Sequence, residues 1–282
     1  VLAGNLTVAD TIAGGTGTDT LTFTDANSNT NDLDNVTAVE TITLGDAATA
    51  VTTVNALVAN GATLTVDATA LTTGSSTLTW TGTGELDGNF SVTGGANNDT
   101  ILGGAGADTI DGAAGNDSIT AGAGADSSVG GANDDTIVLA GNLTVADTIA
   151  GGTGTDTLTF TDAGGAVNEL DNVTTIETIT LGDATTAVTT HDNLVASGAT
   201  LTVTAAALTG ANTLTWTGTA ENDGKFSVTG GDNNDTILGG AGADSITGGA
   251  GIDSITAGAG DDTIVGSQED ILLDGGGHSS KD

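Results

Sequence analysis

Five consecutive nine-residue units fill the stretch Gly94–Val138: GGANNDTIL, GGAGADTID, GAAGNDSIT, AGAGADSSV and GGANDDTIV. A second array, Gly230–Val265, repeats the pattern four times as GGDNNDTIL, GGAGADSIT, GGAGIDSIT and AGAGDDTIV. Each unit has small residues in its first half, Asp at its sixth place and usually Ile at its eighth. Repetition at a short fixed period indicates a solenoid, in which each unit packs only on its neighbours.

Each unit predicts one turn followed by one short strand. The first six residues are rich in glycine, which reaches positive φ and lets backbones approach closely. The last three, such as Thr109-Ile110-Asp111, alternate outward and inward as in a strand. Two units would make one coil of about 18 residues, with stacked strands about 4.8 Å apart. Asp117 would then lie between Asp99 and Asp135 on one side of the coil.

Stacked carboxylates at this separation repel one another by roughly 3 kcal/mol per pair at an effective dielectric constant of about 20. A divalent cation between the turns reverses the sign of this interaction. Calcium accepts six to eight oxygens in irregular geometry, including backbone carbonyls, whereas magnesium requires a tighter octahedron. The predicted carboxylate ligands are Asp19, Asp99, Asp108, Asp117, Asp126, Asp135, Asp147, Asp156, Asp235, Asp244, Asp253 and Asp262. The predicted carbonyl ligands belong to Gly94, Gly95, Gly103, Gly104, Gly106, Gly112, Gly115, Gly124, Gly130, Gly131, Gly230, Gly231, Gly239, Gly240, Gly242, Gly248, Gly249, Gly251 and Gly260.

The competing interpretation is a disordered linker rich in Gly, Ala and Asp. The apolar residues Ile101, Ile110, Ile119 and Ile137 recur at multiples of nine, which a linker does not require. Ser128 departs from the pattern because it stands at the inward place of the fourth unit. It predicts either a locally weak core or a slipped frame in which Val129 turns inward.

The arrays match the pattern G-G-x-G-x-D-x-U-x, in which U is a large apolar residue. On these residues the chain resembles the RTX (repeats-in-toxin) family. The resemblance implies an all-β fold, a right-handed parallel β-roll or β-solenoid with calcium in its turns. It also implies type I secretion of an unfolded chain that folds on extracellular calcium. Composition rich in Gly, Thr and Ala is similar to that of RTX-containing S-layer and other surface-assembly proteins.

The composition limits the partners of the chain. The formal net charge is −35, with 37 acidic and two basic residues, so nucleic acid is not an expected partner. No cysteine is present, and no apolar run approaches the length of a transmembrane segment. We expect a secreted, extracellular or cell-surface protein that binds several Ca²⁺ ions and self-associates into a filament or lattice.

The chain consists of two tandem copies of one module. VLAGNLTVADTIAGGTGTDTLTFTDA begins at Val1 and recurs from Val138. The predicted segments are the end of a calcium β-roll (1–24), a β-solenoid spacer (25–93), a β-roll that crosses the module boundary (94–160), a second spacer (161–229), a second β-roll (230–274) and a flexible tail (275–282).

The spacers alternate apolar and Thr residues, as in Thr77-Leu78-Thr79-Trp80-Thr81, which favours strands. We favour a wider solenoid that leads directly into the roll, and an immunoglobulin-like sandwich is the alternative. A short helix over Val51–Asn60 is a weak further alternative. Trp80 and Trp216 are expected as core filler or at a corner of the solenoid.

Three further features remain open in the sequence. Glu85 and Asp87, matched by Glu221 and Asp223, either bind another ion or form a solvated acidic turn, which is the favoured interpretation. The segment GSQEDILL (Gly266–Leu273) resembles a fifth unit that has lost a residue, so its site is in doubt. Threonine runs could form an ice-binding face, but their irregularity argues against it.

Catalysis is not expected. The sequence contains no HExxH, GxSxG or cysteine nucleophile, and its two histidines are far apart. The repeated Asp residues hold structural places, although a glycosidase-like pair of carboxylates is not excluded by residue type alone. We therefore predict a calcium-dependent structural protein of the bacterial surface. The alternatives are the stalk of a type I-secreted adhesin and the C-terminal region of an exported enzyme or toxin.

Overall fold

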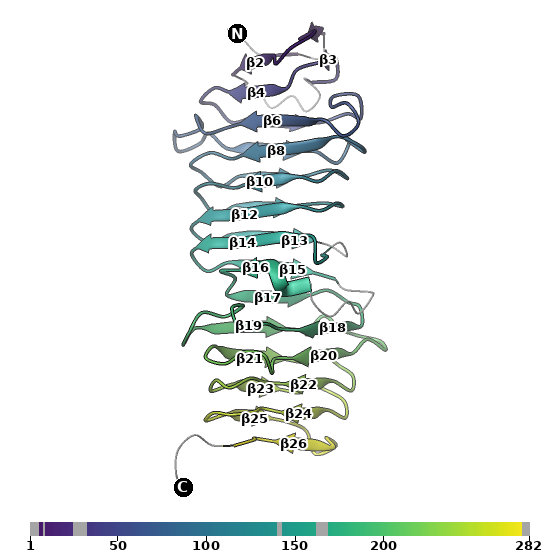
Figure 1. Cartoon of the computed structure of the whole chain (residues 1–282), viewed down its shortest axis with the longest axis vertical. Helices are drawn as coiled ribbons and strands as arrows, with labels where there is room; N and C mark the ends of the chain where they lie inside the picture. The colour runs from purple at the N-terminus through teal and green to yellow at the C-terminus, as the bar shows by residue number, and fades with distance from the viewer. Residues whose placement is uncertain (1–5, 8, 25–32, 140–142, 162–168, 278–282) are drawn as a thin grey trace. The chain divides into compact units, whose positions relative to one another are not determined.

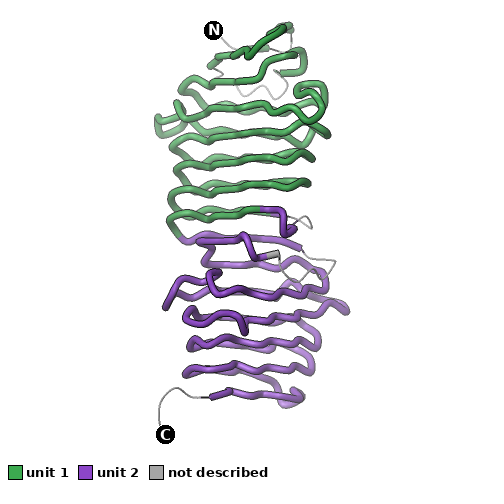
Figure 2. The backbone as a smooth tube through the Cα atoms, in the orientation of Figure 1, with its two compact units in different colours: residues 1–138, 148–154 green, residues 139–147, 155–282 purple. Residues whose placement is uncertain are grey.

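The computed structural model describes residues 6–7, 9–24, 33–139, 143–161 and 169–277 (Figure 1). These residues divide into two compact units, one of residues 1–138 and 148–154, the other of residues 139–147 and 155–282 (Figure 2). Each unit is an all-β parallel solenoid, as the sequence predicted. The helix of the described residues is the short 3₁₀ helix η1 (Glu169–Asn172).

The first unit contains two long parallel sheets. One has the order β14-β12-β10-β8-β6-β4-β2 and the other β13-β11-β9-β7-β5. A separate pair joins β1 (Ile12–Ala13) to β3 (Val36–Thr37). The strands of the long sheets are β2 (Thr20–Phe23), β4 (Thr41–Leu44), β5 (Thr49–Thr52), β6 (Thr63–Asp67), β7 (Leu78–Thr81), β8 (Asn89–Thr93), β9 (Thr100–Leu102), β10 (Thr109–Asp111), β11 (Ser118–Thr120), β12 (Ser127–Ala132), β13 (Thr136–Leu139) and β14 (Thr148–Thr153).

The second unit repeats this arrangement. Its sheets have the orders β25-β23-β21-β19-β17-β15 and β18-β20-β22-β24-β26. The strands are β15 (Thr157–Phe160), β16 (Val173–Thr174), β17 (Thr178–Leu181), β18 (Thr186–Thr189), β19 (Thr200–Thr204), β20 (Leu214–Thr217), β21 (Lys225–Thr229), β22 (Thr236–Leu238), β23 (Ser245–Thr247), β24 (Ser254–Thr256), β25 (Thr263–Val265) and β26 (Leu272–Asp274).

The core of each roll is a row of single aliphatic side chains. Strand β11 pairs with β9 and β13 so that Ile119 lies between Ile101 and Ile137. All three side chains are buried, because a strand turns alternate residues to the same face. The predicted coil of two units is therefore confirmed by the register of the strands. The next coil is longer in sequence, since Ser127 of β12 pairs with Thr148 of β14, whereas Thr109 of β10 pairs with Ser127.

The spacers are wider parallel coils, which contradicts the immunoglobulin-like alternative because that sandwich is antiparallel. Thr63 of β6 pairs in parallel with Asn89 of β8, for example. The segment Val51–Asn60, for which a short helix was considered, contains the end of β5 followed by turns and bends, so that alternative is wrong. Trp80 and Trp216 are fully buried and pack edge-on against Phe90 and Phe226, with ring centroids 5.3 and 5.4 Å apart, as core filler.

The exact bounds of the predicted segments stay predictions, and part of the proposed tail, residues 278–282, lies outside the described residues. The same holds for residues 1–5 and 8 of the first segment, and for residues 25–32 and 162–168 at the starts of the spacers. Residues 140–142, next to the module boundary, also lie outside the described part of the chain.

Ser128 occupies the inward place, between Ile110 and Ile149 of the neighbouring coils. It is fully buried, whereas Val129 is exposed, so the slipped frame is wrong, and the weakness of the core at this coil stays a prediction. The Ser128 hydroxyl has no hydrogen-bond partner among the described residues. Such a group costs roughly 1–3 kcal/mol when it is buried.

We therefore expect Ser128→Val to raise the free energy of unfolding by about 1 kcal/mol or more, because the valine fills the aliphatic row and removes the buried hydroxyl. The measurement is urea unfolding at saturating calcium. Ser127→Val, at the adjacent outward place, is the matched control and should change stability by less than about 0.5 kcal/mol. A lower stability of the Ser128→Val variant would contradict this account of the core.

Candidate metal centre

The sixth-place aspartates are buried at the edge of the roll, directly before each strand. The fully buried members are Asp99, Asp108, Asp117, Asp126, Asp135, Asp147, Asp156, Asp235, Asp244 and Asp253. Asp19 and Asp262, at the ends of the described arrays, are only partly buried. Charged side chains are rarely buried in this way unless an ion or a hydrogen-bond network compensates them.

Within the two arrays, one oxygen of each of these carboxylates accepts a backbone N–H of the preceding coil. Asp117 Oδ1 accepts the N–H of Asp99 at 2.7 Å, and Asp135 Oδ1 accepts the N–H of Asp117 at 2.8 Å. In the second unit, Asp253 Oδ1 accepts the N–H of Asp235 at 2.9 Å. The predicted stacking of aspartates from alternate units therefore occurs within each array.

The second oxygen distinguishes two kinds of turn. In the first turn on each side of an array, which we call a closed turn, Oδ2 accepts the N–H of the second-place glycine. These hydrogen bonds join Gly95 to Asp99 (2.6 Å), Gly104 to Asp108 (2.7 Å), Gly231 to Asp235 (2.7 Å) and Gly240 to Asp244 (2.9 Å). In a closed turn both carboxylate oxygens therefore have a backbone donor.

In the other turns, which we call open turns, the second and fourth places have positive φ. Ala113 and Gly115 have φ of 74° and 123°, and Gly249 and Gly251 have φ of 102° and 119°. Oδ2 of Asp117 and of Asp253 has no hydrogen-bond partner among the described residues. A buried carboxylate oxygen without a donor requires a cation or a proton. The second-place residues with positive φ are Gly15, Ala113, Gly122, Gly131, Gly152, Gly249 and Gly258.

Backbone carbonyls face these carboxylates from the following coil. A Cβ built on Gly112 would stand less than 3.0 Å from both Asp117 Oδ2 and the carbonyl oxygen of Gly130. Both atoms are acceptors, so neither can satisfy the other. Calcium bonds oxygens at about 2.3–2.6 Å and would convert this opposition into shared coordination. Oδ2 of Asp135 lies close to the Gly151 carbonyl in the same way. In the closed turns a carbonyl of the following coil also lies close to Oδ2, although there Oδ2 has a backbone donor as well: Asp99 with Gly112, Asp108 with Ala121, Asp235 with Gly248, and Asp244 with Ala257.

The donor set fits a hard cation that prefers oxygen. Among the residues that the structure describes, no group of three or more His, Cys, Asp or Glu side chains converges on one point. Carbonyl oxygens must therefore supply much of any coordination shell, as calcium permits and as thiolate- or imidazole-preferring metals do not.

Burial dominates the electrostatics of the stacked carboxylates. The pKa of Asp117 is raised to about 7, chiefly by burial; the hydrogen bond from the Asp99 N–H opposes this shift, and the charges of Asp99 and Asp135 add to it. Burial also raises the pKa of Asp99, Asp108, Asp235, Asp244 and Asp253. The fold thus holds these groups where their charged form is unfavourable without a cation.

A comparison with protein families agrees with this geometry. The family model described as RTX calcium-binding nonapeptide repeat (4 copies) matches residues 9–23, 93–128, 106–137, 146–159 and 239–270. The chain carries RTX repeats. These repeats bind calcium and are typical of secreted proteins. No curated protein matches the chain significantly.

In the RTX turns, carbonyls beyond the predicted set also lie close to the aspartates. The predicted carbonyls of Gly112, Gly130 and Gly248 do face an Asp Oδ2, but so do those of Ala121, Gly151 and Ala257. The prediction omitted these three, although any residue at the first place of a unit supplies the same carbonyl. Gly95, Gly104, Gly231 and Gly240 donate their N–H groups to the aspartates of the closed turns, and the ligand role predicted for their carbonyls stays a prediction. For the other predicted carbonyls, ligand roles stay predictions.

Two glutamates outside the RTX repeats were missed. Glu40 Oε2 accepts the N–H of Asp19, and Glu177 Oε2 accepts the N–H of Asp156, both at 2.8 Å. Each glutamate therefore replaces the sixth-place aspartate where the roll meets the spacer. The residues two places earlier, Ala38 and Thr175, both have positive φ. The signal in the sequence was the duplicated ETITL that follows each RTX segment.

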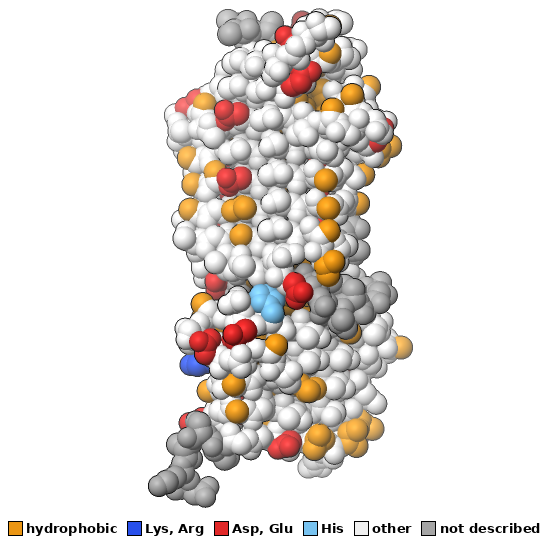
Figure 3. All heavy atoms as spheres, in the orientation of Figure 1, with side chains coloured by type: hydrophobic (Ala, Val, Ile, Leu, Met, Phe, Trp, Pro, Cys, Tyr) orange, Lys and Arg blue, Asp and Glu red, His pale blue; other side chains and the backbone are white. Residues whose placement is uncertain are grey.

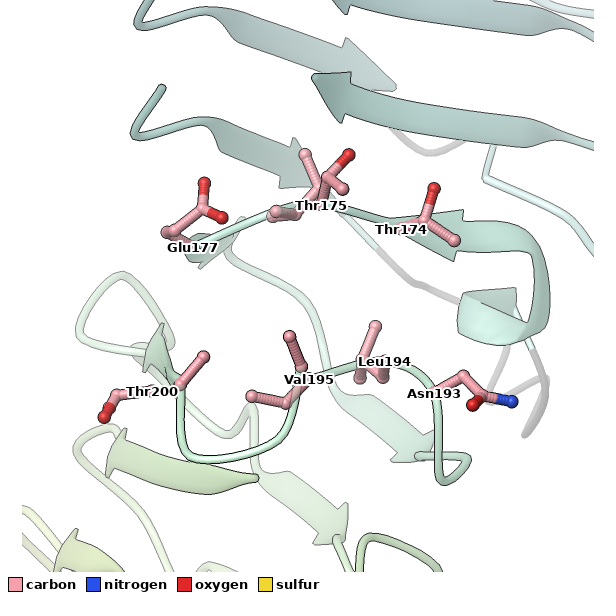
Figure 4. A pocket seen from close by; sticks show the side chains of 10 residues that line it. Thr174, Thr175, Glu177, Asn193, Leu194, Val195 and Thr200 are labelled. Carbon is pink, nitrogen blue, oxygen red and sulfur yellow. The ribbon is translucent and has the colours of Figure 1, made fainter. Parts of the chain in front are cut away.

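A small hollow of about 180 Å³ adjoins Glu177 on the spacer side, lined by Thr174, Leu194, Val195 and others. Figure 4 shows that the Glu177 carboxylate points away from Val195 on the opposite wall. The first unit has an equivalent hollow beside Glu40. These hollows are largely apolar and offer no second carboxylate to an ion.

Glu85 is buried, so the expected solvated acidic turn is wrong for this residue and for Glu221. Glu85 accepts N–H groups of Val58 (3.1 Å) and Gly88 (3.2 Å), and Glu221 accepts those of Val195 (3.3 Å) and Gly224 (2.9 Å). The carboxylate therefore ties two loops of the spacer together. The sequence around these glutamates has no periodic pattern that would predict this contact between loops.

Proposed function

We propose that this chain is a calcium-dependent structural protein of the bacterial cell surface, and that it has no catalytic role. The observation that carries the proposal is the unpartnered Oδ2 of Asp117 and of Asp253. Each of these oxygens is buried in the third nonapeptide of its array. Each such oxygen disfavours the metal-free fold and favours the calcium-bound one. Calcium concentration would then decide whether the chain is folded.

This dependence suits a protein that leaves the cell unfolded. Calcium sites of extracellular modules have dissociation constants of about 10⁻⁴–10⁻³ M, which cytosolic calcium does not fill. The acidic chain, with a net charge of −35, would stay expanded until it meets extracellular calcium. We therefore propose export by a type I system. No helix among the described residues is long and apolar enough to cross a membrane.

Self-association into a filament or lattice is supported by the edges of the solenoid. In the second unit, β25 and β26 are the last of the described strands in their sheets, and Val265, Leu272 and Leu273 on these strands are exposed, as is Ile271 directly before β26. Exposed apolar edge strands are templates for pairing with another chain. On the face in Figure 3, acidic side chains far outnumber basic ones, so calcium would also reduce repulsion between copies.

We expect particle size to grow when calcium is added to the folded protein at rising protein concentration. Light scattering and electron microscopy, with equal magnesium as the control, test this directly. Ordered filaments or sheets support the structural role. A monodisperse chain at every millimolar calcium concentration would exclude self-assembly and favour the alternative, an adhesin stalk that presents a domain elsewhere.

A further inference from the structure

The last described coil of the second unit closes on the segment GSQEDILLD (Gly266–Asp274). Ser254 of β24 pairs with Leu272 of β26, as Thr236 of β22 pairs with Ser254. The coil therefore keeps the length of the coil before it, and the expectation that this unit has lost a residue is wrong. Strands β25 and β26 thus form a complete edge to which a further coil can add.

The inward side chains at this edge are less buried than their counterparts one coil earlier. Ile264 of β25 pairs with the fully buried Ile246 of β23 but is itself only partly buried. Leu273 of β26 pairs with the fully buried Ile255 and is 47% exposed. A further coil packed on this edge would remove both side chains from water.

The first unit presents a free edge at β1 and β2. Among the described strands, β1 pairs with β3 alone and β2 pairs with β4 alone. Ile12 of β1 is only partly buried, whereas its counterpart Ile149 in the duplicated sequence is 0% exposed. The two isoleucines differ because β14 is paired with β12, and β1 has no equivalent partner among the described strands.

The pairing of β14 with β12 shows how this sequence adds to a nonapeptide array. Strand β12 begins in the fourth nonapeptide of the first array, and β14 belongs to the duplicated sequence that also starts at Val1. Ser128 meets Ile149, and the N–H of Thr148 donates to the Asp126 carbonyl at 2.8 Å. Strand β25 lies in the fourth nonapeptide of the second array, so it offers the same kind of edge as β12.

We propose that β25 and β26 of one copy bind β1 and β2 of a second copy in a head-to-tail junction. Strand β1 adds to β25 rather than to β26, because the coil rises along the chain and each of these two strands is the earlier one of its pair. Backbone N–H and carbonyl groups of the two edges supply the hydrogen bonds, as in other strand additions. By the register of β12 with β14, the expected pairs are Thr263 with Thr11, Ile264 with Ile12, and Val265 with Ala13.

The junction joins two different surfaces, so each copy keeps one free edge and the contact can repeat as a filament. Ile264 faces Ile12 in this junction, whereas the pairing within the first unit sets Ser128 against Ile149. The inward row is therefore more apolar between copies than at the equivalent place within one copy. This inference rests on the proposed calcium-dependent self-association and assigns it to one pair of surfaces.

The test is a mixture of two variants, each with one edge blocked by a charge. Ile264→Asp blocks the β25 edge and Ile12→Asp blocks the β1 edge, because an unpaired carboxylate between two coils is unfavourable. In millimolar calcium, each variant alone should stay monomeric by analytical ultracentrifugation and give the circular dichroism of the folded wild type. An equimolar mixture should form dimers and nothing longer, since the intact β25 edge of Ile12→Asp can bind the intact β1 edge of Ile264→Asp.

Leu86→Asp is the matched control, because it places the same charge at a spacer side chain that is 64% exposed, and it should assemble as the wild type does. A wild type that assembles together with edge variants that also assemble alone, or a mixture without dimers, would overturn this junction and leave the proposed self-association standing. A wild type that stays monodisperse in calcium would instead overturn the self-association itself. The two failures are therefore distinguishable.

Cysteine pairs measure the register without blocking either edge. The chain contains no cysteine, so a mixture of Ala13→Cys and Val265→Cys reports this contact alone. Oxidation in calcium should link the two variants into disulfide dimers. Thr11→Cys with Val265→Cys should not cross-link, because the shift of two residues would set the Cα atoms more than about 7 Å apart. Assembly in calcium without a disulfide between Ala13→Cys and Val265→Cys would overturn the proposed register.

Discussion

Removal of calcium with a chelator is expected to convert the folded chain into an expanded coil. The far-UV β-sheet signal should be lost and the hydrodynamic radius should increase. Each site filled at a calcium concentration about 100 times its dissociation constant stabilises the fold by roughly 2.7 kcal/mol. A few such sites equal the whole stability of an ordinary domain, about 5–15 kcal/mol.

The local cause of this unfolding is that buried carboxylate and carbonyl oxygens lose the cation that neutralises them. Without calcium, Oδ2 of Asp117 and the carbonyl of Gly130 face each other with no donor between them. Both basic residues of the chain, Lys225 and Lys281, lie outside the first array and cannot replace the ion there. The same loss of stability therefore occurs at successive coils, and the losses add up along the array.

Circular dichroism and size-exclusion chromatography during a calcium titration measure this effect. Equal magnesium is one control, and about 1 M sodium chloride, which shortens the Debye length to about 3 Å, is the other. We expect neither to restore the fold at concentrations where calcium does. Full refolding in sodium chloride alone would show that charge screening suffices and that specific sites are not needed.

The sequence was sufficient for the solenoid because its signals are local and repeated. Ile101, Ile119 and Ile137 recur once per coil, so the spacing of the isoleucines alone predicts the register in which their strands pair. The solenoid fold of the spacers could be predicted from their alternating apolar and Thr residues and from the lack of linkers between spacer and repeats. Trp80 was expected in the core, and it is there.

Details of the site depend on contacts that the repeat pattern does not encode. Gly95 and Gly249 both occupy the second place of a unit, yet only Gly249 has positive φ. The difference follows position in the array, since the closed turns are the first on each side. Glu40 and Glu85 bind backbone of other coils through single contacts, which leave no periodic trace in the sequence.

Acidification is expected to stabilise the metal-free fold. Burial raises the pKa of Asp117 to about 7 in the folded chain, above its ordinary value of 3.8. The folded state therefore binds this proton more tightly than the unfolded state does. The resulting stability is fully present below pH of about 4 and is lost as the pH rises through about 7. The raised pKa values of Asp99 and Asp253 act in the same direction.

When calcium is removed with a chelator, the β-sheet signal should thus increase as the pH falls from about 7 to about 4. When calcium is present, the same acidification should weaken calcium binding, because protons compete for the carboxylates. Asp117→Asn mimics the protonated acid, so it should make the metal-free protein more stable at pH 7 and less sensitive to pH. The exposed Asp34→Asn is the matched control. If both variants kept the wild-type pH profile, the buried carboxylate would not be the source of the instability. A proton at Asp117 removes the same unpaired charge that calcium neutralises, so the two ligands should stabilise one fold and exclude each other at one oxygen.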